Sequence, residues 1–255
     1  MISSSVKFLL NDKLIEIKNP DPNQTLLSYI RTELKKTGTK EGCSEGGCGA
    51  CTIVLGELVD NKIEYKAINS CISFVPSLNG KQLIIVEDLV SQNGKLHPVQ
   101  DAMVKFHGSQ CGFCTPGFVM SLFSMFKNNK SLNNELITDS ISGNLCRCTG
   151  YRPIIDAAKS LNKINKNDQF SKNKNKVIQQ LKKIKPKNVY IKKDDKIYFS
   201  PKNIKDLKGI IKKHSNFSFL AGGTDLSLKV TKERKEIPFI IDLKEINELD
   251  FIKVS

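Results

Sequence analysis

Four cysteines in the first third of the chain are spaced like the ligands of an iron–sulfur cluster. They are Cys43, Cys48, Cys51 and Cys71, a C-x4-C-x2-C run followed by a more distant fourth cysteine. This is the plant-type spacing for a 2Fe–2S cluster. Three thiolates must point inward from one tight loop, and the surrounding glycines permit positive φ angles and leave room for N–H groups near the sulfurs. We therefore predict a first 2Fe–2S site here.

The other four cysteines form two short pairs further along the chain. They are Cys111, Cys114, Cys146 and Cys148. Two residues turn about 200° in an α-helix, so Cys146 and Cys148 can converge only from a loop, and Thr149-Gly150 marks such a break. Cys114 precedes Thr115-Pro116, which is typical of an N-cap and first helical residue, and a helix N-terminus stabilises a thiolate. Beside the first set, these four predict a second cluster.

Other interpretations fit the cysteines less well. Zinc favours repeated C-x2-C pairs, often with histidine, whereas the first run is glycine-rich C-x4-C-x2-C. His97 and His107 lie at expected helix ends and His214 on the expected surface, so we do not expect them as ligands. No nucleophile–base arrangement is visible, which favours an electron carrier without catalytic residues of its own.

The first cysteine set must be held by a small mixed sheet with one crossing helix, over residues 1–85. Strands are indicated at residues 6–10 and 14–18 around an Asn11-Asp12 turn, and at 52–55, 63–67 and 82–86. Apolar residues at helical spacing predict a helix over 25–36, with Thr25 as its N-cap.

Residues 86–162 lose the strand periodicity and are expected to form a compact helical bundle around the second set. The expected helices cover residues 98–107, 117–126, 138–145 and 153–161. The apolar stripe of Phe118, Leu122, Met125 and Phe126 is interpreted as core rather than as a cofactor site.

The net charge of +14 is concentrated in the C-terminal part of the chain. Residues 1–155 carry a net +2 and residues 156–255 a net +12. Much of the excess lies in a Lys/Asn-rich run, and we expect residues 163–188 to be a solvated linker. The run has no arginine and one aromatic residue, Phe170, whereas a nucleic-acid arm needs arginines, stacking aromatics or a folded basic face.

Residues 189–255 alternate strand and helix patterns again, with a helix expected over 201–213 and strands over 217–221 and 239–243. A glycine pair follows the first of these strands. The segment is Phe219, Leu220, Ala221, Gly222, Gly223, Thr224, Asp225 and Leu226. Such a loop can present N–H groups and a hydroxyl to phosphate groups, although a simple turn gives the same residues.

Residues 40–52, 107–118 and 143–151 resemble the two cluster motifs of molybdenum hydroxylases, and the likeness extends over residues 6–160. One departure is Gly47, where the family often has Asp at a position that is not a ligand. The resemblance implies an α+β chain with a β-grasp 2Fe–2S ferredoxin-like domain and then a four-helix 2Fe–2S-binding bundle. After the linker, residues 189–255 resemble the start of a PCMH-type FAD-binding domain, of which we expect only the N-terminal part.

The order of cluster, cluster and flavin is similar to the small subunit of bacterial-type xanthine dehydrogenases. The resemblance implies that a separate large subunit oxidises hypoxanthine or xanthine to urate at a molybdopterin centre. Electrons then pass through the second and first clusters to FAD, bound by Phe219–Leu226, and to NAD. Gln110 matches the residue that contacts the pterin of the partner. The alternatives are the same subunit of an aldehyde or N-heterocycle oxidoreductase and, more remotely, a zinc and nucleic-acid-binding module.

Composition also limits where the protein is expected. No apolar run approaches the ~20 residues of a membrane span. The N-terminus reaches Asn11-Asp12-Lys13 too soon for the apolar core of a secretion signal. Eight cysteines assigned to clusters rather than disulfides agree with a reducing compartment. We therefore expect a cytoplasmic chain in a hetero-oligomer, with no membrane or nucleic-acid partner.

Overall fold

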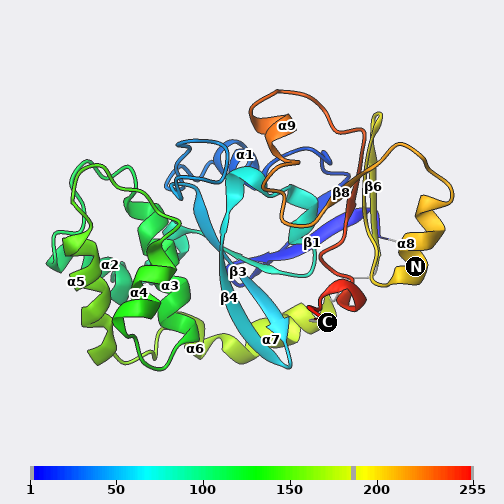
Figure 1. The fold of residues 1–255 in the computed structure, drawn as a ribbon. Coiled ribbons are helices and arrows are strands. Elements are labelled where there is room, and N and C mark those ends of the chain that lie inside the picture. Colours follow the sequence, from blue (N-terminus) through cyan, green and yellow to red (C-terminus); the bar gives the residue numbers. More distant parts are fainter. Residues whose placement is uncertain (1–2, 185–187, 254–255) are drawn as a thin grey trace.

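The chain builds two β-sheets and a group of helices, which the computed structural model describes for residues 3–184 and 188–253 (Figure 1). The strands are β1 (Ser5–Leu10), β2 (Lys13–Lys18), β3 (Thr52–Val59), β4 (Lys62–Asn69), β5 (Gln82–Ile84), β6 (Val189–Lys193), β7 (Lys196–Ser200), β8 (Ser218–Leu220) and β9 (Phe239–Asp242). The α-helices are α1 (Leu26–Thr32), α2 (Pro98–Lys105), α3 (Thr115–Asn128), α4 (Asn134–Ile141), α5 (Arg152–Ser160), α6 (Gln169–Lys172), α7 (Lys174–Lys183), α8 (Ile204–Ile211) and α9 (Leu228–Thr231). The short 3-10 helices are η1 (Ser70–Ile72), η2 (Val75–Leu78), η3 (Val86–Leu89), η4 (Leu161–Lys163) and η5 (Asn247–Leu249).

The first domain is the expected mixed sheet with a crossing helix. Its five strands lie in the order β2-β1-β5-β3-β4, with β1 and β5 parallel and the other neighbours antiparallel. Asn11 makes the β1–β2 turn with a φ of 53°. The Thr25 hydroxyl accepts a hydrogen bond from the Ser28 N–H at 3.2 Å, so the predicted N-cap is confirmed. The helix ends at Thr32, earlier than expected.

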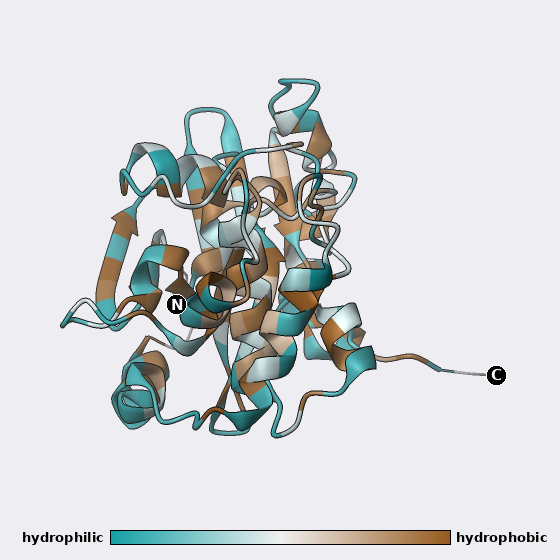
Figure 2. Cartoon of the chain, turned by 90° about the vertical axis from the view of Figure 1, so that its left-hand side faces the viewer, coloured by the Kyte–Doolittle hydropathy of each residue, from teal (hydrophilic) through white to brown (hydrophobic). Residues whose placement is uncertain are grey.

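Helices α2–α5 form the second domain, and α3 packs against β3 and β4 of the first. The prediction of a helix over residues 138–145 is wrong by one turn, because the Asn133 carboxamide caps α4 by accepting from the Leu136 N–H at 2.8 Å. The N-cap of α3 is Cys114 rather than Thr115. Figure 2 views this side of the molecule and shows apolar and polar stretches on the same helices, as amphipathic packing requires.

The Lys/Asn-rich segment after the helical domain differs from the solvated linker expected from its composition. It forms α6 and α7, and three of its apolar side chains are buried in the core that the first two domains share: Phe170, Val177 and Leu181. Helix α7 packs against β3 and β4, beneath the first sheet in Figure 1. Residues 185–187 of the expected linker lie outside the described residues. The lysines of α7 therefore lie on either side of a narrow apolar stripe, which the overall composition of the segment does not indicate.

A buried charge cluster fastens this segment to the helical domain. The Asp168 carboxylate lies 3.0 Å from Nε2 of His97 and 2.7 Å from Nζ of Lys127, and all three side chains are at most 6% exposed. It also caps α6 by accepting from the Ser171 N–H at 2.8 Å. His97 in turn caps α2, where its Nδ1 accepts from the Val99 N–H at 3.3 Å. A segment that composition describes as solvated is thus held by one of the most buried ionic groups in the described chain.

The third part, residues 188–253, packs on the first domain rather than standing apart from it. Its sheet has the strand order β6-β7-β9-β8. Val189, Ile191 and Tyr198 belong to the same apolar core as Val6 and Phe8 of β1. Asn23 closes this contact with two hydrogen bonds to the backbone of residue 237, at 3.0 and 2.6 Å. In the part of the chain that the structure describes, no helix is both long and apolar enough to cross a membrane.

Candidate iron–sulfur sites

The first cysteine set converges at the edge of the first sheet. Cys43 and Cys48 lie on the loop between α1 and β3, Cys51 directly precedes β3, and Cys71 lies in η1. Three N–H groups donate to Sγ of Cys43: those of Glu45 at 3.5 Å, Gly47 at 3.3 Å and Cys48 at 3.3 Å. Such donors offset the negative charge that bound thiolates would carry. The glycine-rich loop therefore does what its sequence predicts.

The sulfurs of this set come as two pairs. Sγ of Cys51 lies 3.3 Å from Sγ of Cys71, and the thiol of Cys43 interacts with that of Cys48. Among the described residues, no group of three or more His, Cys, Asp or Glu side chains is arranged to hold one metal ion. A four-thiolate zinc site needs four sulfurs around one centre, whereas a two-iron cluster takes four cysteines over two metal ions. The paired arrangement fits the two-iron cluster.

The second set repeats this paired pattern on loops of the helical domain. Cys111 and Cys114 lie between α2 and α3, and Cys146 and Cys148 between α4 and α5. The thiol of Cys111 interacts with that of Cys148, and the thiol of Cys114 with that of Cys146. Each cysteine of the α2–α3 loop therefore faces one cysteine of the α4–α5 loop. As expected for a C-x-C pair, neither Cys146 nor Cys148 lies on a helix.

The protein environment favours thiolate at one sulfur of each buried pair. The interaction with the Cys71 thiol lowers the pKa of Cys51 to about 7, while the same contact and burial raise the pKa of Cys71. In the second set, burial opposes ionisation of Cys146, but hydrogen bonds from Thr149 outweigh it and lower the pKa to about 7. Burial and the interaction with Cys146 raise the pKa of Cys114 to about 12. Thiolates are the metal-binding form, so the lowered pKa values of Cys51 and Cys146 favour metal binding at these two sulfurs.

The two sites touch each other through the backbone. The Leu145 N–H, next to Cys146, donates to the carbonyl of Cys48 at 2.9 Å. Asn144 stands behind this contact, because its side chain is 3% exposed and donates to the carbonyl of Gly49 at 3.0 Å. A Cβ on Gly49 would lie 2.3 Å from the carbonyl oxygen of residue 143, and φ there is +70°. Glycine at this position is what lets the two loops meet.

We predict that Asn144→Ala loosens this junction. The Ser121 hydroxyl donates to Asn144 Oδ1 at 2.6 Å inside the core, so the variant leaves a buried hydroxyl unpaired. The free energy of unfolding should fall by about 1–3 kcal/mol. Chemical denaturation of the reconstituted chain measures this, and Ser142→Ala, an exposed neighbour, should change it by less than about 0.5 kcal/mol. Equal stability of the two variants would contradict the assigned role of Asn144.

The glycine pair after β8 lies against the first site. Ala221, Gly222, Thr224 and Asp225 are exposed, and a Cβ on Gly222 would meet nothing within 4 Å. Gly223 is different, because it is buried with a φ of +77° and a Cβ there would lie 2.9 Å from the carbonyl oxygen of Ile72. Open space at Gly222 fits an approaching phosphate, while Gly223 is required by packing. Phe219 and Leu226 flank the loop, and Leu220 is buried beneath it.

The remaining candidate residues divide by exposure. Gln110 is exposed beside the exposed Cys111, on the face of the second site that points to solvent. The histidines lie away from both cysteine sets: His97 is buried in the Asp168 cluster, His107 follows α2, and the His214 ring packs on Phe239 with centroids 5.0 Å apart. Sequence reasoning missed Asn144, Ser227 and Lys232. The first lies inside a cysteine motif and could have been noticed, whereas the other two act across about 150 residues or more and had no local signal.

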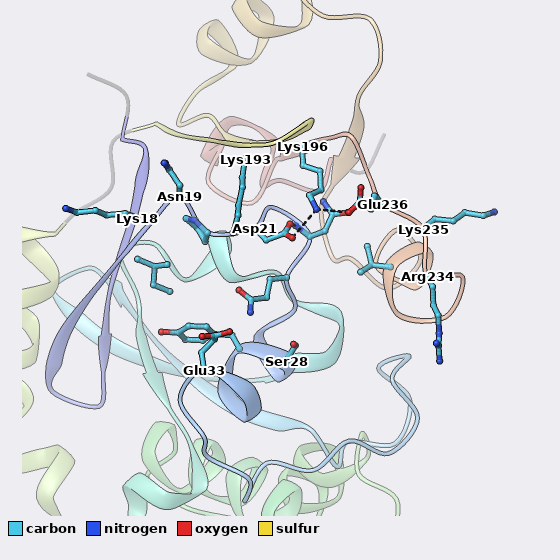
Figure 3. Close-up of a pocket in the computed structure, with 16 residues that line it drawn as sticks. Lys18, Asn19, Asp21, Ser28, Glu33, Lys193, Lys196, Arg234, Lys235 and Glu236 are labelled. Carbon is cyan, nitrogen blue, oxygen red and sulfur yellow. Dashed lines mark hydrogen bonds and ion pairs between the residues drawn. The ribbon is translucent and has the colours of Figure 1, made fainter.

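A cavity of about 690 Å³ lies between β2, the start of α1 and the third part of the chain (Figure 3). Five cationic and three carboxylate side chains line it, and Lys196 among them pairs with Asp21 at 3.1 Å and with Glu236 at 2.7 Å. No cysteine lines it. The cavity therefore adds nothing to the two cysteine sites.

Three protein families match successive parts of the chain. Residues 8–76 match the family described as 2Fe-2S iron-sulfur cluster binding domain, and residues 85–159 match the 2Fe-2S binding domain. Residues 190–255 match the FAD binding domain in molybdopterin dehydrogenase. The two iron–sulfur domains and the start of an FAD-binding domain therefore follow one another in this chain.

Individual relatives match about three fifths of the chain. The chain is 52% identical over 159 residues to xanthine dehydrogenase from Blastobotrys adeninivorans, covering 61% of this chain and 11% of the relative. It is 45% identical over 160 residues to aldehyde oxidase 1 from Macaca fascicularis, covering 62% and 12%. The chain thus spans about an eighth or less of the length of these relatives.

One solved structure is matched over a larger share of its own length than the relatives above. A chain of quinoline 2-oxidoreductase from Pseudomonas putida 86 superposes with a TM-score of 0.51 and 30% identity, over 71% of this chain and 98% of that one. This chain therefore covers nearly the whole of that solved chain. The two cysteine sites, the three family matches and these relatives all agree. The chain belongs to the molybdenum hydroxylase family and is an electron-transfer region with iron–sulfur and flavin-binding domains.

Proposed function

We propose that this chain carries electrons from a molybdopterin centre on a partner subunit to FAD and then NAD. Cys43, Cys48, Cys51 and Cys71 would hold one 2Fe–2S cluster, and Cys111, Cys114, Cys146 and Cys148 would hold the other. When bound, these clusters supply one-electron redox chemistry, which thiolate ligands and N–H donors tune. The chain itself supplies the ligands, fixes their spacing and buries Cys51 and Cys71 of the first set.

The hydrogen bond from the Leu145 N–H to the Cys48 carbonyl is the observation that carries this proposal. Cys48 belongs to the first set, and Leu145 directly precedes Cys146 of the second set. The two sites are therefore linked by one hydrogen bond and the few covalent bonds on either side of it. Separate metal sites with only structural roles have no need of such a junction. Asn144 and Gly49 hold the loops together from behind.

The two sites differ in exposure. Cys51 and Cys71 are 1% and 2% exposed, whereas Cys111 and Cys148 are exposed. Phe113 and Leu145, both about half exposed, lie beside the second set and could be covered by a partner. We therefore place the molybdopterin subunit on this face, with Gln110 as a hydrogen-bonding contact to its pterin.

FAD would bind at the other end of the carrier. Residues 219–226 comprise the end of β8 and the loop after it, whose exposed residues flank the buried Gly223, and Gly223 lies against Ile72, the neighbour of Cys71. Its open side at Gly222 suits a pyrophosphate that accepts N–H hydrogen bonds. The flavin end and the partner end of the chain thus lie on opposite sides of the linked cysteine sites.

Iron analysis and electron paramagnetic resonance (EPR) of the full chain test the carrier role. We expect about four irons and a matching amount of inorganic sulfide per chain after anaerobic purification, and two distinct signals after reduction. Stoichiometric zinc without iron would overturn the proposal and favour a structural metal site. A single reducible centre would also contradict it, because a relay needs both.

For the whole enzyme we propose purine oxidation, in which hypoxanthine and xanthine become urate. The support is the identity of 52% to one xanthine dehydrogenase, whereas several other xanthine dehydrogenases and aldehyde oxidases alike are 44–47% identical to this chain. The complex with its molybdopterin subunit should reduce NAD when supplied with xanthine. Turnover of aldehydes or of an N-heterocycle such as quinoline, without purine turnover, would assign the substrate to the other class and leave the carrier role intact.

A further inference from the structure

The third part of the chain, residues 188–253, contributes a cation to the first cysteine site. Lys232, the residue that ends α9, donates from Nζ to the carbonyl oxygen of Cys43 at 3.0 Å. The same ammonium lies 3.2 Å from the Glu45 carboxylate, which belongs to the cysteine loop. Lys232 is 189 residues away from Cys43 in the sequence, so this contact depends entirely on how the third part docks.

The position of Lys232 is fixed by packing at the base of its helix. The buried Ser227 hydroxyl donates to the carbonyl of Ile72 at 2.7 Å. Leu228 packs on the small apolar cluster that contains Cys51 and Cys71. Helix α9 therefore rests on one pair of cysteines, and Lys232, its C-cap residue, reaches the other pair.

We infer that Lys232 sets the reduction potential of the cluster held by Cys43, Cys48, Cys51 and Cys71. Reduction adds negative charge, so a nearby ammonium stabilises the reduced state and raises the potential. Glu45 has the opposite effect, and its contact with Lys232 limits it. The inference rests on the proposed carrier function. It means that the flavin-binding part of the chain influences the potential of the cluster that would give electrons to the flavin.

The expected effects have opposite signs for the two partners. Lys232→Gln should shift the midpoint potential of the first centre to more negative values, because the cation is lost and Glu45 is left unpaired. Glu45→Gln should shift it to more positive values, and the double variant should lie between the two. Lys232→Arg should retain the potential of the unmodified chain. The second centre should not move in any of them.

EPR-monitored redox titration of the full reconstituted chain measures these potentials. Lys229→Gln is the matched control, since it removes one positive charge from an exposed position on the same helix. The shift caused by Lys232→Gln should shrink at high ionic strength, because Lys232 and Glu45 are each 48% exposed and salt screens such groups.

Two outcomes would overturn the inference, and they can be told apart. If both centres form but the potential of the first is the same in Lys232→Gln and Lys229→Gln, Lys232 has no such role and the carrier function stands. If the unmodified chain forms no two-iron centres, the carrier function and the inference fail together. A shift of both centres by similar amounts would indicate a general structural effect and would also contradict the role of Lys232.

Discussion

Replacing Cys71 by serine is expected to remove one of the two iron–sulfur centres and leave the other in place. Cys71 is 2% exposed and lies 3.3 Å from Cys51, so a serine there presents a protonated hydroxyl where the metal requires a thiolate. The iron content should fall from about four to about two per chain. One EPR signal should disappear after reduction, and the signal of the second set should remain.

The complementary variant, Cys148→Ser, provides the matched comparison. Cys148 is exposed and belongs to the other set, so the signal that survives in Cys71→Ser should be the one lost here. Ser44→Ala, in the loop of the first set, should retain both signals. Loss of both centres in either cysteine variant would show that the two sites do not form independently, in contrast to the division assigned from the paired sulfurs.

The Asp168→Asn variant is expected to have the largest effect on stability. It leaves the Lys127 ammonium, whose side chain is 6% exposed, without a counter-charge, and removing one partner of a buried ion pair costs about 3–5 kcal/mol. For a chain of this size, the midpoint of thermal unfolding should fall by roughly 6–20 °C. Asp101→Asn is the control, because its pair with Lys105 is exposed and is worth less than about 1 kcal/mol.

Acid should act on the same group. Burial alone would raise the pKa of Asp168, but hydrogen bonds from His97 and Lys127, the Lys127 charge and the Ser171 amide hold it well below its usual value. A lowered pKa contributes stability above the unfolded-state value of about 3.9, and that contribution is lost as pH falls further. The unmodified chain should therefore lose stability below about pH 4 more steeply than Asp168→Asn. Parallel acid profiles would contradict this assignment.

Much of the fold and the cysteine sites could be predicted because the signals are local. The C-x4-C-x2-C run needs one glycine-rich loop, and the Asn11 turn and the Thr25 cap each depend on a few neighbouring residues. Such features are determined by backbone geometry and short-range hydrogen bonds, which the sequence states directly. The same holds for the strand that precedes the glycine pair at Gly222.

The features that escaped prediction all depend on distant parts of the chain. Phe170, Val177 and Leu181 form a sparse stripe among lysines, and they are buried because β3 and β4 supply a surface for them. The pairing of Cys111 with Cys148 rather than with Cys114 depends on how two loops face each other. Lys232 reaches Cys43 only after the third part has docked. Composition and periodicity contain no information on such contacts.

The apolar core that β1 shares with the third part has a consequence for the order of events during synthesis. Val6 and Phe8 leave the ribosome early, yet they pack with Ile237 and Ile240, and Asn23 bonds to a backbone made 214 residues later. At about 5–20 residues per second, that interval lasts roughly 10–40 s. During it, part of the first domain is exposed to chaperones and to solvent. The face of the first domain that holds Val6 and Phe8 therefore gains its full cover only after residues 237–240 have been made.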